Sequence, residues 1–336
     1  MKNKKMFAVL SLLVIFALVL SACGSATPNP TEEPMEEPME EPVEEPMEEP
    51  VEEPEEEPME EAAPMFGTEE KPIIWVLVPS QDADAVLTGA EEIAADIEAK
   101  TGLVVTPLVS TDFTGAVEAM CNNEAQIGAL NTFNYVLAHE RGCADVGVVS
   151  VRFGSTFYTG QVVTGADTGI ESIADLAGKT FCRPDPTSTS GWVIPSIAMQ
   201  AEGIDPETDL AQIVDAGGHD GVILSVYNGD CEAGSTFVDA RSNVEEEYPD
   251  VMEKVVVIAE SAPIPNDTIS FQPELPAELT ATLVNYFVDT AATEDGLALL
   301  AAVYSWSGIE QVEDSFFDGF RQQLEAAGIN IEELAN

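Results

Sequence analysis

Four hydroxyl residues, Thr187, Ser188, Thr189 and Ser190, stand in a row in the stretch RPDPTSTSGWVIPSIAM, residues 183–199. The segment before them, TFCRPDP, has the character of a β-strand, and an apolar helix is expected to open at about Gly191. Hydroxyl donors, unpaired N–H groups at a helix N-terminus and a glycine that permits close approach together favour an anion, with phosphate or a relative as the natural occupant. The alternative is that one hydroxyl caps the helix while the others are ordinary loop polarity. Composition alone leaves both interpretations open.

The segments around this cluster alternate between strand and helix from Lys71 onward. Strand-like runs occupy residues 72–80, 103–110, 126–130, 146–153, 180–186, 211–217 and 231–240, and helical spacing occupies residues 82–102, 113–125, 132–142 and 221–230. This rhythm predicts an α/β protein with mainly parallel sheets, and the length allows two lobes. In such sheets ligands bind at the carboxyl ends of strands, which is where the hydroxyl cluster falls. Amphipathic helices at residues 276–292 and 316–328 are expected to pack back on the first lobe.

The first residues predict export. In residues 1–22, Lys2, Lys4 and Lys5 precede an apolar run that is too short to be read as a membrane span, which is typical of a signal peptide. The run ends at LSAC, which resembles the bacterial lipobox and would make Cys23 the lipidated mature N-terminus; the alternative is an ordinary signal with an incidental cysteine. Residues 31–61 repeat Glu-Glu-Pro with a four-residue period, and we expect an extended, disordered stalk within residues 23–70. The predicted location is therefore extracytoplasmic, lipid-anchored to the outer face of the cell membrane or periplasmic.

The charge of the chain excludes some partners. The formal net charge is −50, and the sequence after the stalk is acidic too. Nucleic acids and anionic membrane surfaces require clustered lysine and arginine, so neither is an expected partner. The stalk could also act as a cation trap, but a solvated charge run is the favoured interpretation.

Four cysteines besides Cys23 allow three disulfide pairings in an oxidising compartment. We favour Cys121 with Cys143 and Cys182 with Cys231, because each pair then falls inside one predicted lobe. The alternative is a zinc site, but no pair has the C-x-x-C spacing and the chain has only two histidines, so no metal is expected.

Several segments together resemble a known family. The motif DPTSTSGWVIP is followed by AGGHDGVILSVYNGDCEAGSTFVDAR and IPNDTISF, and TDFTGAVEAMCNNEAQIGALNTFNYVLAHE lies upstream. From about Ile73 to the C-terminus, this pattern is similar to the phosphate, phosphite and phosphonate binding proteins of ABC importers. The resemblance implies a type II periplasmic-binding-protein fold, in which two α/β lobes joined by a two-strand hinge close on the ligand. Lobe 1 would comprise residues 71–158 plus 265–336 and lobe 2 residues 159–264, with crossings near residues 158–163 and 261–266.

The resemblance also implies the function and the ligand groups. A monomer without cofactor or enzymatic activity would capture a phosphonate, phosphite or phosphate and deliver it to the transmembrane subunits of an ABC permease. Matched position by position, it places Ser188, Thr189 and Ser190 on the phosphoryl oxygens and adds Tyr158, His219, Asp239 and Asp267. Since a carboxylate accepts a hydrogen bond from a protonated oxygen or an ammonium group and repels a sulfate-like anion, the two aspartates are expected to carry specificity. Phe113 stands where members of the family have tyrosine, which keeps the ring and removes a hydroxyl donor.

Each of these residues also has a structural interpretation. His219 could cap the helix that starts at Gly221, Asp267 could be a turn residue after Pro265, and Tyr158 could be a core aromatic. Arg152 and Arg183 are interpreted as structural residues or ion-pair partners. A hydrolase triad of a serine, His219 and an aspartate is disfavoured because the chain has no G-x-S-x-G elbow. A ligand-sensing domain for a membrane partner, or the same fold binding another small organic anion, remain the alternative functions.

Overall fold

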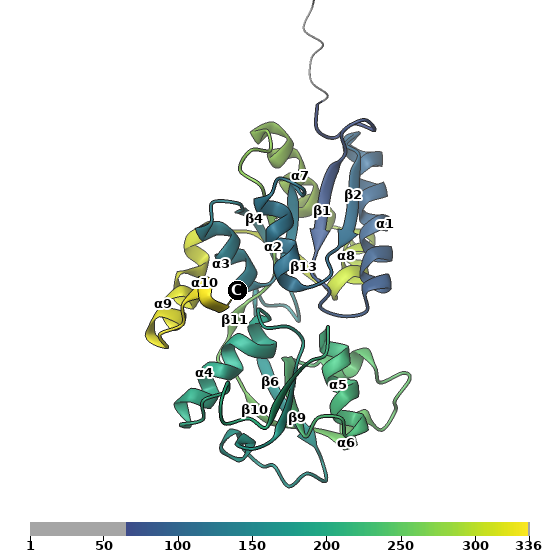
Figure 1. Ribbon diagram of the computed structural model, residues 1–336. Coiled ribbons are helices and arrows are strands. Elements are labelled where there is room, and N and C mark those ends of the chain that lie inside the picture. The colour runs from purple at the N-terminus through teal and green to yellow at the C-terminus, as the bar shows by residue number, and fades with distance from the viewer. Residues whose placement is uncertain (1–64, 335–336) are drawn as a thin grey trace, which may run out of the picture. The chain divides into compact units, whose positions relative to one another are not determined.

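The structure is a computed structural model that describes residues 65–334 (Figure 1). The predicted signal peptide, Cys23 and the Glu/Pro repeat of residues 31–61 lie outside the described residues. Residues 65–70, the end of the range expected for the stalk, are described and form a turn in which Phe66 packs against the core and the Gly67 carbonyl accepts from the Val104 N–H. Within residues 65–334, no helix combines the length and apolar character needed to cross a membrane.

The described chain contains thirteen strands and ten α-helices. The strands are β1 Ile73–Leu77, β2 Val105–Val109, β3 Ile127–Leu130, β4 Asp145–Val151, β5 Phe157–Tyr158, β6 Gly160–Gly165, β7 Thr180–Arg183, β8 Gln212–Asp215, β9 Ala233–Phe237, β10 Val255–Glu260, β11 Ile264–Pro265, β12 Thr268–Phe271 and β13 Gly308–Gln311. The helices are α1 Ala83–Thr101, α2 Phe113–Cys121, α3 Thr132–Glu140, α4 Ile194–Ala201, α5 His219–Asn228, α6 Val251–Lys254, α7 Ala277–Ala291, α8 Glu294–Tyr304, α9 Asp318–Ala326 and α10 Ile331–Leu334. Each strand and helix predicted from the sequence pattern corresponds to an observed element, and the predicted and observed ends differ by a few residues at most.

Local chemistry explains where these elements begin and end. Helix α1 starts where the Asp82 side chain accepts a hydrogen bond from the Ala85 N–H, and it stops at Gly102, whose φ of 75° is a left-handed conformation that glycine adopts without strain. Strand β1 is an apolar run in which Ile73, Trp75 and Leu77 are fully buried. Such a run is typical of a strand covered on both faces.

The first sheet has six strands in the order β13-β4-β12-β3-β1-β2. Strands β1, β2 and β3 pair in parallel, whereas β12 lies antiparallel between β3 and β4, and β13 is antiparallel to β4. The prediction of mainly parallel sheets is therefore wrong for this sheet, which is mixed. Helical crossovers make β1 to β3 parallel, but the returning chain inserts β12 in the opposite direction, and the apolar pattern of a strand carries no information about its direction.

The second sheet has five strands in the order β10-β6-β9-β7-β8 and is mixed too. Strands β7, β8 and β9 are parallel, while β6 runs antiparallel to its neighbours β9 and β10. The chain passes from the first sheet to the second through β5 and returns through β11, and these two short strands pair antiparallel with each other. The two crossings expected near residues 158–163 and 261–266 thus lie side by side.

Helices complete the layers around the first sheet. Helices α1, α7 and α8 pack on one another, α7 also contacts β4 and β13, and α2 packs on α3. The return of the C-terminal helix α7 to the first sheet is confirmed. Trp75 of β1 makes an edge contact with Phe287 of α7, with 5.9 Å between the ring centres.

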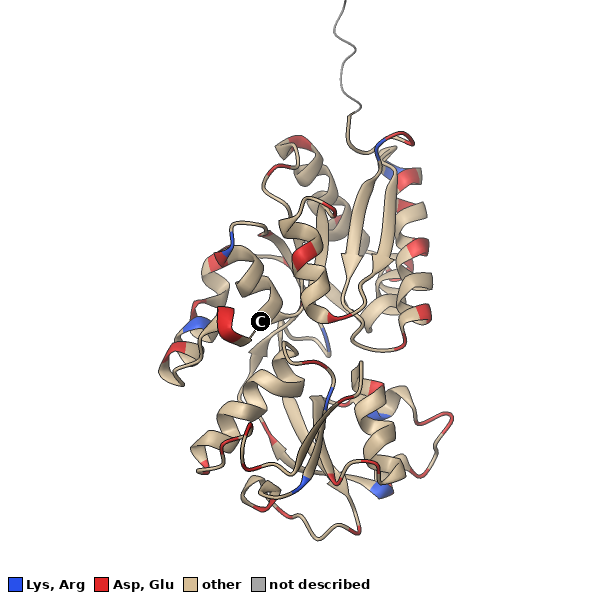
Figure 2. Ribbon diagram, viewed as in Figure 1, with Lys and Arg blue, Asp and Glu red and all other residues tan. Residues whose placement is uncertain are grey.

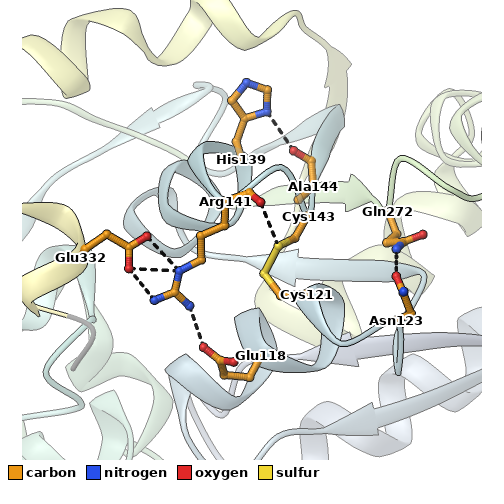
Figure 3. Close-up of a disulfide and its surroundings, with 9 residues drawn as sticks. All are labelled: Glu118, Cys121, Asn123, His139, Arg141, Cys143, Ala144, Gln272 and Glu332. Atoms are coloured by element: carbon orange, nitrogen blue, oxygen red, sulfur yellow. Dashed lines mark hydrogen bonds and ion pairs between the residues drawn. A yellow bond between two sulfur atoms is a disulfide. The ribbon is translucent and has the colours of Figure 1, made fainter.

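Two disulfides join segments around the sheets, with the pairing expected from the sequence. Cys121 bonds to Cys143 and Cys182 to Cys231. Figure 3 shows the first bond beside Arg141, whose guanidinium lies 2.6 Å from Glu118 and 2.7 Å from Glu332. The disulfide and this arginine therefore hold α2 and the end of α3 together and attach α10 to them.

Candidate ligand-binding site

The predicted hydroxyl cluster lies on a small enclosed cavity of about 20 Å³. Residues associated with both sheets line it: Val78, Ser80, Phe113, Asn131, Arg152, Tyr158, Ser188, Thr189, Ser190, His219, Phe237 and Asp267. All predicted ligand residues except Asp239 are in this set. This volume of about 20 Å³ exceeds what a single water needs.

The hydroxyl residues form the entry to a π-helical turn, Thr189–Val193 (η2), that continues into α4. The Ser188 side chain accepts a hydrogen bond from the Gly191 N–H at 3.2 Å, so this serine is the helix cap. A Cβ atom at Gly191 would lie 2.3 Å from Pro184 Cδ, which explains the glycine. Both interpretations of the cluster therefore have structural support, because the capping serine also faces the cavity.

Thr189 links this turn to the first sheet. Its hydroxyl donates to Asn131 Oδ1 at 3.0 Å and accepts from the Phe133 N–H at 2.9 Å. Asp185 makes a second link, because its carboxylate accepts the Phe113 N–H at 3.2 Å as well as the N–H and hydroxyl of Thr187. Burial raises the pKa of Asp185, although these hydrogen bonds oppose the shift. The cavity is thus closed by hydrogen bonds between residues that follow strands of different sheets.

Four helix N-termini converge on the cavity. Phe113 begins α2, Asn131 caps α3, Ser188 caps η2 and His219 begins α5. Helix N-termini carry a partial positive charge and present N–H groups. Acidic residues follow the outer face of α1 and occur along many exposed loops (Figure 2), so the chain combines an acidic surface with a cavity that favours an anion.

His219 is positioned on three sides. Its Nδ1 lies 2.9 Å from Thr236 Oγ1, its Nε2 lies 3.5 Å from Ser188 Oγ, and its ring meets the Phe237 ring edge-on at 4.6 Å. Burial, and secondarily the charge of Arg152, lower the pKa of His219 to about 3. The imidazole is therefore neutral at physiological pH, and it can donate through one nitrogen only.

Two further predicted residues, Asp267 and Tyr158, line the cavity together with His219. Burial raises the pKa of Asp267, and the charge of Arg152 opposes that shift. Burial and the neighbouring Asp267 raise the pKa of Tyr158, whereas hydrogen bonding to Ser190 and Thr189 lowers it. Tyr158 consequently keeps its hydroxyl proton and can act as a donor.

Asp239 lies elsewhere, and the expectation that it is a ligand group is not supported by the geometry. Its carboxylate accepts from Arg241 Nε at 2.9 Å and from Arg241 Nη2 at 2.7 Å, and it caps a short 3₁₀ turn, Ala240–Asn243. These hydrogen bonds lower the pKa of Asp239. Arg241, two residues downstream, binds this carboxylate, which is therefore not available to a ligand. The sequence VDAR places the two residues close together and could have indicated this ion pair.

Sequence reasoning missed three polar residues of the cavity. Arg152, interpreted as structural, lines it, and so do Ser80 and Asn131. Arg183 does behave as a structural residue, because its Nε lies 2.6 Å from Asp215 and its guanidinium stacks on the Trp192 ring. The Asn-Thr sequence at residues 131–132 is a helix-capping signal and could have indicated Asn131; nothing local distinguished Arg152 from Arg183.

Comparison with known proteins identifies the family. Residues 75–317 match the family model of ABC transporter, phosphonate, periplasmic substrate-binding proteins. The chain belongs to this family. Its members are substrate-binding proteins of transporters rather than enzymes.

Individual relatives agree with that assignment. The phosphate-import protein PhnD of Mycolicibacterium smegmatis is 26% identical over 273 residues, which cover 75% of this chain and 84% of the relative. The binding protein component of an ABC phosphonate transporter from Pseudomonas aeruginosa superposes with a TM-score of 0.71, at 20% identity over 79% of this chain and 88% of that one. PhnD1 from Prochlorococcus marinus, solved with methylphosphonate, gives a TM-score of 0.68 at 13% identity, covering 76% and 98%. These two structural matches establish the shared fold.

The buried, neutral His219 predicts how stability depends on pH. Between pH 6.5 and about 3 the unfolded chain binds a proton at this position that the folded chain does not. Stability should therefore fall as the pH decreases through this window, by up to about 1.4 kcal/mol per pH unit from this group. Asp185, Asp220 and Asp267, whose pKa values are raised by burial, act in the opposite direction.

Urea unfolding of the wild type and of His219→Gln at pH 7, 6, 5 and 4 isolates the histidine, because the aspartates are common to both proteins. We expect the stability difference between the two proteins to change with pH. Parallel curves would show that the pKa of His219 is the same in the folded and the unfolded chain.

Proposed function

We propose that this chain is an extracytoplasmic receptor that encloses a small phosphorus oxyanion in the cavity and delivers it to an ABC permease. The observation that carries the proposal is the convergence of four helix N-termini and the hydroxyls of Ser188, Thr189 and Ser190 on one small cavity. Backbone N–H and hydroxyl donors suit the oxygens of a tetrahedral anion. Asp267, which lines the cavity, would accept a hydrogen bond from a protonated ligand oxygen.

The two-lobe arrangement belongs to the same proposal. Residues 71–158 plus 265–336 would form one lobe and residues 159–264 the other, with the paired strands β5 and β11 as the hinge. The bonds of Thr189 and Asp185 to residues of the other lobe would be made on closure and broken on opening. Closure would exclude water and bring the hydroxyls to the ligand. Cys23, in its lipobox-like LSAC context, would tether this receptor to the membrane near its permease.

Calorimetric titration tests the proposal directly. The ligand-free protein is titrated with phosphate, phosphite, methylphosphonate, 2-aminoethylphosphonate and sulfate. We expect micromolar or tighter binding to at least one phosphorus compound and no heat with sulfate, which has no proton for Asp267 to accept. If none of the four phosphorus compounds produces heat of binding, the proposed ligand class is wrong and another small organic anion is favoured.

A further inference from the structure

Arg152 differs from every other arginine of the chain. Arg141, Arg183, Arg241 and Arg321 each form an ion pair with a carboxylate. Arg152 is only 7% exposed, its Nε has no hydrogen-bond partner, and no ion pair joins its guanidinium to a carboxylate within residues 65–334. In a protein with 62 acidic residues, an arginine that is buried and unpaired calls for an explanation.

The fold holds this side chain firmly against the cavity. Arg152 directly follows β4, and its backbone N–H and carbonyl both bond to Ser155 across a tight turn. Its guanidinium carbon lies 4.5 Å from the centre of the Phe237 ring. Backbone and ring together fix the orientation of a group that also lines the cavity.

Such a group is stable only if something compensates its charge. Arginine does not lose its proton in proteins, so it cannot become neutral as the buried His219 does. Desolvating a guanidinium is costly, and the ring of Phe237 together with the charge of the neighbouring Asp267 offsets only part of that cost. A second donor also lacks an acceptor. Asn131 lines the same cavity, and its Nδ2 is buried without a hydrogen-bond partner.

We propose that Arg152 binds the ligand directly and makes the site selective for a small anionic head group whose substituent carries no positive charge. Ionised phosphoryl oxygens would pair with the guanidinium and accept from Asn131 Nδ2. A ligand whose substituent carries an ammonium group would be disfavoured by repulsion from Arg152, which lines the cavity. The preferred class is therefore phosphate, phosphite or methylphosphonate rather than an aminoalkylphosphonate. This inference rests on the proposed function.

The first test needs no variant. Wild-type protein is titrated with methylphosphonate and with 2-aminoethylphosphonate under identical conditions. We expect the aminoalkyl compound to bind at least tenfold more weakly. Equal or tighter binding of the aminoalkyl compound would overturn the selectivity.

The second test compares two arginines that both stack on an aromatic ring. Arg152→Gln removes the charge from the cavity, whereas Arg183→Gln removes a charge that is paired with Asp215 and stacked 4.4 Å over the Trp192 ring. We expect Arg152→Gln to weaken binding of the best ligand by tenfold to a hundredfold and Arg183→Gln to change it by less than threefold. Arg152→Lys, which keeps the charge and loses the planar fork, should fall between Arg152→Gln and wild type, and it replaces Arg152→Gln if that variant does not fold.

The outcomes separate this inference from the proposed function. If wild type binds none of the phosphorus compounds, the proposed function fails and this inference with it. If wild type binds one of them and Arg152→Gln binds it equally well, only the role of Arg152 is overturned, provided that a melting curve shows the variant to be folded. The guanidinium would then contribute only its packing on the Phe237 ring.

Discussion

Replacing Ser188 and Ser190 together with alanine is expected to weaken ligand binding by more than tenfold while the protein stays folded. Both side chains are buried on the cavity wall, at 1% and 2% exposure. A hydrogen bond to a charged group contributes about 1.5–3 kcal/mol, so the loss of even one exceeds the ~1.4 kcal/mol that corresponds to tenfold. Calorimetry with the best-binding phosphorus compound measures the change.

The same substitution has a predictable cost in stability. Ser188 caps the helical turn through the Gly191 N–H, and loss of such a cap costs about 1 kcal/mol. Thr187→Val is the matched control, because Thr187 belongs to the same hydroxyl run but directs its hydroxyl to Asp185 and does not line the cavity. The control should bind within threefold of wild type. Unchanged affinity in the folded double variant would reduce the cluster to a helix cap.

Removing the Cys182–Cys231 disulfide is expected to have the largest effect on stability. The bond closes a separation of 49 residues and joins β7 to the segment before β9, and both sulfurs are buried. In the chain-entropy model, a loop of that length contributes ~4 kcal/mol by restricting the unfolded chain. Its loss is a large share of the ~5–15 kcal/mol that a folded domain typically has.

The first disulfide provides the matched comparison. Cys121–Cys143 closes a separation of 22 residues, for which the same model gives ~3 kcal/mol, and its cysteines are only partly buried. Urea unfolding of Cys182→Ala/Cys231→Ala and of Cys121→Ala/Cys143→Ala gives both free energies. We expect the former pair to lose more. A loss below 1 kcal/mol for Cys182→Ala/Cys231→Ala would show that the unfolded chain is already compact between these positions.

Local patterns in the sequence sufficed to predict most of the strands and helices. Alternating apolar strands and amphipathic helices produced the α/β class, and the resemblance supplied the positions of Phe113, Tyr158, Ser188, His219 and Asp267, all of which line one cavity. The strand and helix predictions succeeded because such signals act over a few neighbouring residues, whereas the cavity residues were implied by the resemblance. The disulfide pairing also followed from proximity within each predicted lobe.

Strand direction and charge pairing were decided by tertiary structure. Strand β12 enters the sheet antiparallel between β3 and β4, a choice that depends on a chain returning from the other sheet. Arg183 of β7 pairs with Asp215 of the neighbouring strand β8, whereas Arg152 lines the cavity and its Nε has no hydrogen-bond partner. A sequence shows which charges exist, but which of them meet depends on distances that are fixed only when the sheets are packed together.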